Sequence, residues 1–216
     1  MTFLKNYKRY TTYYIPKFLV QYYLFLKYIG MSNVVKGAIL INGQNIESYS
    51  LTKIRTIMKA IPQEVSHFGN TIKDALDPSN KSKNNDDNEM EKIMVNLLEN
   101  LGISSCLSLD KSMNSLSPGQ KQEIAIAQAL IQDPKVLILD EATSVIETEK
   151  KFVTNLLRIC SEKKITLISV MHRLTNIMEY DNVIVIGDGR MLEDGKPINL
   201  LKKPMGFFSS LYRNSV

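Results

Sequence analysis

Two carboxylates directly follow a short apolar run in the second half of the chain. Val136 to Leu139 are all apolar, and Asp140 and Glu141 come next. Such a run is typical of a strand buried on both faces of a parallel sheet, and open α/β sheets bind ligands at the carboxyl edge of their strands. One carboxylate suits Mg²⁺ and the other suits a base that orients or deprotonates water. A strand that ends in a solvated acidic turn would show the same pattern.

A second candidate site is a helix start at Leu116 to Gln120. Ser117 can cap a helix, Pro118 fits the first helical position, and Gln120 can reach back to complete a capping box. Free N–H groups, a hydroxyl and Gly119 at a helix start favour phosphate binding. Plain helix capping would explain the same residues.

Two further polar residues follow predicted strands. His172 comes directly after the apolar stretch Ile165 to Met171, and Gln63 follows Pro62 at the end of a short extended piece. A lone histidine is more often structural than functional, and Gln63 taken alone indicates nothing.

Strands and helices alternate from residue 118 onward, which indicates an α/β fold with a mainly parallel sheet. Strands are expected at 38–42, 59–62, 136–139, 165–171, 182–186 and 190–193, with turns at 42–43 and 187–189. Helices are expected at 51–58, 90–101, 117–132, 150–163 and 174–178, followed by two small C-terminal helices, and residues 78–88 are expected to form a loop.

The order and spacing of these motifs resemble the ABC ATPase family over residues 37 to 216. Asp140 lies twenty residues after Gln120, and His172 lies thirty-one after Glu141. The resemblance implies a P-loop NTPase-like ABC fold, N-terminally incomplete, with a helical signature subdomain at about residues 71–132. It also implies ATP and Mg²⁺ as cofactors.

The resemblance assigns a role to each motif. Leu116 to Gln120 resemble the signature, normally Leu-Ser-Gly-Gly-Gln, in which Ser117 and Gly119 would contact the γ-phosphate of ATP held by a partner domain. Asp140 resembles the Walker B aspartate that binds Mg²⁺, and Glu141 resembles the catalytic glutamate.

Three more positions carry roles implied by the family. Gln63 resembles the Q-loop glutamine, which touches the Mg²⁺ or water site and senses the transmembrane domain. Ser144 to Glu147 resemble the D-loop, and His172 resembles the switch histidine at the γ-phosphate.

Other stretches resemble the second nucleotide-binding domain of the multidrug-resistance-associated subfamily, which implies an exporter of organic anions or conjugates. These stretches are Thr71 to Lys73, Leu76 to Pro78, His172 to Leu174, Leu200 to Leu201 and Gly206 to Leu211.

The match departs from the family at the expected Walker A loop, G-x-x-x-x-G-K-[ST]. Residues 1–36 contain one glycine, Gly30, and none near Lys17, so Lys17 is not expected to bind nucleotide. Pro118 removes an N–H from the signature, and Glu147 replaces the usual D-loop aspartate. The chain is therefore expected to bind ATP poorly and to hydrolyse it negligibly by itself.

Composition also changes near residue 37. Residues 1–36 hold seven of ten Tyr, six of 27 basic residues and no acidic ones, so the remaining residues carry 21 basic against 22 acidic, a net charge of −1. This balance does not support a nucleic-acid partner. The first 36 residues remain open to three interpretations: an amphipathic or membrane-proximal helix, a degenerate first strand and helix, or an artefact of the upstream reading frame.

No apolar run reaches the 18 residues that a membrane helix needs; the closest, Phe18 to Met31, contains Gln21 and Lys27. The two cysteines, Cys106 and Cys160, favour a reducing compartment over a disulfide framework. We expect the chain at the cytoplasmic face of a membrane, held there by a transmembrane partner or a missing upstream region.

Two functions from different classes remain. The chain is either the ATPase domain of an ABC exporter or a catalytically silent module that supplies its signature to ATP on an intact partner domain. Either function implies a second ABC domain and transmembrane domains as partners. A non-transport ABC protein of the DNA-repair or ribosome type is a weaker alternative, because it would carry coiled coils or a second complete domain.

Overall fold

The chain divides into two compact units, each described by itself. A sheet unit comprises Met1–Ala60, Pro134–Glu141 and Lys164–Val216, and a helical unit comprises Ile61–Asp133 and Ala142–Lys163. The structure, a computed structural model, describes residues 10–14, 40–41, 43–65, 69–78, 87–103, 108–146, 149–171, 173–188 and 190–215.

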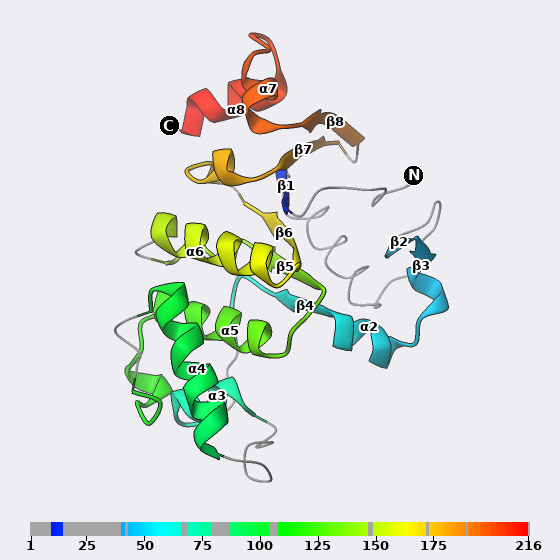
Figure 1. The fold of residues 1–216 in the computed structure, drawn as a ribbon. Coiled ribbons are helices and arrows are strands. Elements are labelled where there is room, and N and C mark those ends of the chain that lie inside the picture. Colours follow the sequence, from blue (N-terminus) through cyan, green and yellow to red (C-terminus); the bar gives the residue numbers. More distant parts are fainter. Residues whose placement is uncertain are drawn as a thin grey trace. The chain divides into compact units, whose positions relative to one another are not determined.

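Six of the described strands form one sheet in the order β4-β5-β6-β1-β7-β8 (Figure 1). Strand β1 pairs in parallel with β6 and β7, β5 pairs in parallel with β6, and β8 pairs antiparallel with β7. The predicted α/β class with a mainly parallel sheet is therefore confirmed. The strands are β1 (Tyr10–Tyr14), β4 (Met58–Ile61), β5 (Val136–Asp140), β6 (Thr166–Val170), β7 (Asn182–Gly187) and β8 (Arg190–Gly195).

Strand β1 comes from the aromatic N-terminal segment and lies between β6 and β7. Tyr13 is in register with Val170 on one side and with Ile184 on the other. Residues 10–14 of that segment are therefore part of the sheet, and the three interpretations of residues 1–36 as a whole stay open. The expected boundary at residue 37 therefore does not separate residues 10–14 from the sheet.

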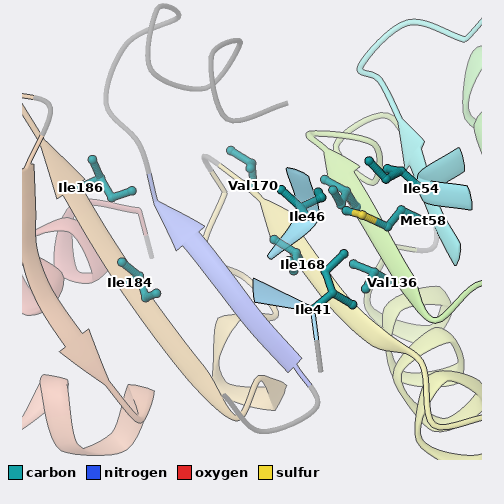
Figure 2. Packing of buried hydrophobic residues seen from close by; sticks show 10 residues of the cluster. Ile41, Ile46, Ile54, Met58, Val136, Ile168, Val170, Ile184 and Ile186 are labelled. Atoms are coloured by element: carbon teal, nitrogen blue, oxygen red, sulfur yellow. The ribbon is translucent and has the colours of Figure 1, made fainter. Parts of the chain in front are cut away.

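Buried aliphatic side chains of the sheet unit form one hydrophobic core cluster. Figure 2 shows Ile168 and Val170 on β6 and Ile184 and Ile186 on β7. Because the side chains of a strand alternate between faces, each pair shares one face. The remaining members come from β5 and from the segment 41–58: Ile41, Ile46, Ile54, Met58, Val136 and Ile138. Each such side chain contributes about 1.5–3 kcal/mol when fully buried.

A short hairpin precedes the first described helix of the sheet unit. Strands β2 (Leu40–Ile41) and β3 (Gln44–Asn45) pair antiparallel, and Gly43 between them has φ of 81°. This left-handed conformation favours glycine, which agrees with the predicted turn, although Asn42 lies outside the described residues. A 3₁₀ helix, η1 (Ile46–Ser48), and helix α2 (Leu51–Ile57) follow.

The described residues of the helical unit form four α-helices. Helix α5 packs against α3 and α4, and α4 packs against α6. The Asn155 side chain on α6 donates a hydrogen bond to the backbone oxygen of Leu101, at 3.1 Å, where α4 ends. The helices are α3 (Ile72–Leu76), α4 (Asp87–Leu101), α5 (Pro118–Ile131) and α6 (Glu149–Glu162), with a 3₁₀ helix, η4 (Met113–Ser115), before α5.

Two predicted elements differ from the observed ones. The short helix expected at 174–178 is instead a 3₁₀ helix, η5 (Ile177–Glu179), which Asn176 precedes without a side-chain cap. The loop expected up to residue 88 ends earlier because α4 begins at Asp87, where acidic residues favour the first turn of a helix. The two small C-terminal helices are confirmed as α7 (Pro197–Leu201) and α8 (Phe207–Ser215).

Helix α6 buries a thiol. Phe152, Leu156, Leu157 and Cys160 are buried on one side of the helix, as its spacing predicts. Burial raises the pKa of Cys160 to about 12, and Lys163 opposes this effect. None of the helices in the described ranges is both long and apolar enough for a bilayer crossing.

Cys160 is expected to resist thiol reagents in the native state. With Cys106→Ser leaving a single thiol, Ellman's reagent at pH 8 should modify Cys160 in urea but not in buffer. Because the folded pKa is raised above its ordinary value of 9.0, the stability that Cys160 contributes is complete below about pH 9 and is lost as the pH rises towards 12. Rapid modification of the native chain would contradict this expectation.

Candidate functional site

Three parallel strands end at the same edge of the sheet unit. Asp140, the last residue of β5, is in register with Val170, the last residue of β6. Val170 is also in register with Tyr13, one residue before the end of β1. The chain therefore leaves β1, β5 and β6 at one edge, where half-buried Asp140 stands.

Glu141 turns the chain sharply at this edge. Its φ is 50°, a left-handed conformation that costs a residue other than glycine roughly 1–3 kcal/mol. Its N–H donates to the backbone oxygen of Val170 at 2.9 Å, which ties the turn to the end of β6. This bond helps to hold Glu141, also half-buried, at the carboxyl edge directly after Asp140.

The donors at this edge fit Mg²⁺ that arrives with a nucleotide better than a resident metal. Among the described residues, no group of three or more His, Cys, Asp or Glu could hold a metal ion. Mg²⁺ needs only one or two carboxylates when water and phosphate oxygens complete its shell. Asp140 offers one carboxylate at this edge, and its expected role as a Mg²⁺ ligand stays a prediction.

The helical unit contains the predicted helix start. Ser117 Oγ accepts a hydrogen bond from the Gln120 N–H at 3.2 Å, and Gln120 Oε1 accepts one from the Ser117 N–H at 2.9 Å. Pro118 occupies the first turn of α5. The predicted capping box is confirmed, which explains why the helix begins here.

The capping box leaves few backbone donors for a ligand. The first N–H groups of a helix lack intrahelical partners, but Pro118 has no N–H, and that of Gln120 is bonded to Ser117. The N–H of Lys121 bonds to the backbone oxygen of Ser117 at 2.9 Å. The Gly119 N–H therefore remains as the donor of this turn, together with the Ser117 hydroxyl.

Gly119 is also required because a residue with a side chain would not fit at this position. A Cβ on this buried glycine would lie 2.5 Å from the backbone oxygen of Val145 and 3.3 Å from the Cα of Ile146. The turn that contains Ser144 therefore sits directly on the first turn of α5. Close backbone approach of this kind requires a residue without a side chain.

A buried glutamine outside the sequence motifs lies on the same helix. Gln122 is 1% exposed, and its Nε2 donates to the backbone oxygen of Pro62 at 2.9 Å. Pro62 immediately precedes Gln63, which is exposed. Gln122 precedes the apolar residue Ile126 by about one helical turn on the same face, and this placement is the sequence signal for a buried polar contact.

The predicted site residues thus fall into two groups. The sheet unit holds Asp140 and Glu141, and the helical unit holds Gln63, Ser117, Gly119, Gln120 and Ser144. Lys17 and the two predicted site residues Glu147 and His172 lie outside the described residues.

A family model described as "ABC transporter" matches residues 24–144, more than half of the chain. The chain belongs to the ABC transporter family. The match begins before residue 37, so the resemblance extends further toward the N-terminus than the motifs alone predicted. The roles expected for the individual residues of this ABC domain stay predictions.

Curated relatives include exporters and members of the C subfamily. The chain is 30% identical over 201 residues to the ABC transporter ATP-binding protein/permease VMR1 of Saccharomyces cerevisiae. It is 32% identical over 184 residues to ABC transporter C family member 3 of Dictyostelium discoideum, and 38% identical over 186 residues to a putative export ATP-binding/permease protein of Rickettsia typhi. These matches cover 84%, 82% and 82% of this chain but only 12%, 13% and 31% of the relatives.

A solved structure shares the fold of this ABC domain. The structure of a bacterial Atm1-family ABC exporter with ATP bound matches with a TM-score of 0.78 and 24% identity. The match covers 95% of this chain and 37% of that one.

Gly119→Ala is expected to destabilise this ABC domain despite the better helix propensity of alanine. The new Cβ would meet the Val145 carbonyl at 2.5 Å, and such overpacking costs about 1–3 kcal/mol, whereas alanine alone would gain up to about 1 kcal/mol. Urea unfolding measures the net change. Ala125→Gly, half-buried in the same helix, is the matched control for propensity. An unchanged or increased free energy of unfolding for Gly119→Ala would refute the close packing.

Proposed function

We propose that this chain is the nucleotide-binding domain of an ABC exporter and works as one of two paired ABC domains. Two relatives support an exporter, since one is named a permease and the other a putative export permease. Transmembrane domains, on this or another polypeptide, would carry the transport path and hold the domain at the cytoplasmic face of a membrane. The C-family relatives support membership of the multidrug-resistance-associated subfamily. We propose that this chain corresponds to the second nucleotide-binding domain of such a protein.

The helix start of α5 carries the proposal. Its capping box holds Ser117 in an extended conformation, with φ of −65° and ψ of 160°, at the end of a 14-residue helix. The hydroxyl of Ser117 and the N–H of Gly119 can then donate to a phosphate oxygen, helped by the positive end of the helix dipole. In a pair of domains this loop would contact the γ-phosphate of ATP held by the second domain.

The carboxyl edge of the sheet unit would serve the chain's own nucleotide. Asp140 would hold Mg²⁺, and Glu141, with its backbone fixed by Val170, would orient or deprotonate the attacking water. Gln63 and His172 would approach the same phosphate, as the family resemblance implies. ATP would supply the phosphoryl group, and positioning and charge stabilisation would provide most of the catalysis.

We further propose that this second role is weak in the chain as it stands. Strand β1 ends at the edge where Asp140 lies, and the residues that follow it in sequence are Ile15, Pro16 and Lys17. Phosphate-binding loops need glycines because several backbone N–H groups must approach one phosphate. The chain would then act mainly by supplying its signature to an intact partner.

The purified chain is expected to release no saturable phosphate from Mg-ATP. Phosphate release titrated against ATP concentration should stay at background, and Glu141→Gln should give the same trace because the base has no bound substrate to act on. Saturable turnover that Glu141→Gln abolishes would show instead that the chain is a working ATPase.

A chimera tests the proposed signature role. The segment of the yeast relative that corresponds to this chain downstream of Gly37 would be replaced by this chain's residues, and ATP hydrolysis measured in membrane vesicles. Ser117→Arg should lower the rate by about 100-fold or more, as loss of a preorganised donor does. Asn114→Arg, on an exposed residue of η4, is the matched control. A folded chimera with equal rates for both variants would overturn the proposal.

A further inference from the structure

A single polar side chain joins two segments of the helical unit that lie sixty residues apart. Gln122 is 1% exposed, and its Nε2 donates to the backbone oxygen of Pro62 at 2.9 Å. A buried amide without a partner is costly, so this bond accounts for a polar residue on the packed face of α5. The bond also determines which part of the chain is held against the helix.

The acceptor lies at the start of the Gln63 loop. Strand β4 ends at Ile61, and Pro62 and Gln63 continue beyond it. Pro62 has no N–H to donate, so its carbonyl is the backbone group available for an anchor at this position. The bond from Gln122 therefore restrains the chain directly before Gln63.

The same end of α5 contacts the loop that contains Ser144. Gly119 lies under the Val145 carbonyl, and Gly119 and Gln122 are three residues apart, which places them on neighbouring positions of one helix face. The first turns of α5 thus hold the segment before Gln63 and the turn after Ser144. Ser117 begins the same helix.

We infer that Gln122 is a positioning residue that ties the Gln63 loop to the helix carrying Ser117 and Gly119. The functional meaning of this tie rests on the proposed function, in which Gln63 and the signature act in one cycle. In that setting, a displacement of the Gln63 loop is transmitted to the signature helix through one side-chain hydrogen bond. The physical tie itself requires neither nucleotide nor partner.

Hydrogen exchange of the purified full chain, followed by mass spectrometry, tests the tie. Gln122→Met keeps the length of the side chain and removes the donor. The amides of Ile61 and of residues 63–65 should exchange roughly tenfold faster, since loss of one buried hydrogen bond shifts local opening by about that factor. Peptides covering β5 should keep their rates. Gln128→Met, half-buried further along α5, is the matched control and should leave residues 61–65 unchanged.

A second variant separates the hydrogen bond from general packing. Gln122→His restores an N–H donor of similar reach and should recover at least part of the protection at residues 61–65. Three results would overturn the inference: no change in Gln122→Met, equal acceleration in every peptide including β5, or equal acceleration by Met and His. Since exchange is measured without ATP, failure here is distinguishable from failure of the chimera, which tests the proposed function.

Discussion

Parallel pairing of β1, β5 and β6 sends three segments of the chain out of the sheet at the same edge. The register of Asp140 with Val170, and of Val170 with Tyr13, makes this edge common to all three strands. The carboxylate of Asp140 and the turn at Glu141 then stand where β1 and β6 also end. Without this pairing, residues more than a hundred positions apart in sequence would have no shared surface for chemistry.

Helix α5 plays the corresponding part in the helical unit. Its start is held by the reciprocal bonds of Ser117 and Gln120, and its first turns contact two loops through Gly119 and Gln122. These contacts differ in kind. Ser117 and Gln120 cap the helix, Gly119 packs closely against backbone because it lacks a Cβ, and Gln122 donates a side-chain hydrogen bond. Ser117 and Gly119, which are predicted to bind a ligand, therefore also help to hold the helical unit together.

Much of this arrangement was predictable from the sequence. Apolar runs and helical spacing located β5, β6, β7, α4, α5 and α6 to within a few residues. This was possible because the buried face of a helix or strand requires apolar residues at a characteristic spacing. The capping box of Ser117 and Gln120 was also predictable, because it depends on four consecutive residues. The 3₁₀ helix at Ile177–Glu179 was not, because short segments with weak spacing take their conformation from their surroundings.

By itself, the sequence determined the class of fold, the motifs that place the chain among ABC domains, and the order in which its site residues occur. Only the tertiary structure decided that Tyr10–Tyr14 enters the sheet between β6 and β7, that Gly119 is required by the Val145 carbonyl, and that Gln122 reaches Pro62. The reason is physical. Local patterns record which residues are buried, whereas contacts between distant segments depend on how strands pair and helices pack, and no short window of sequence contains that information.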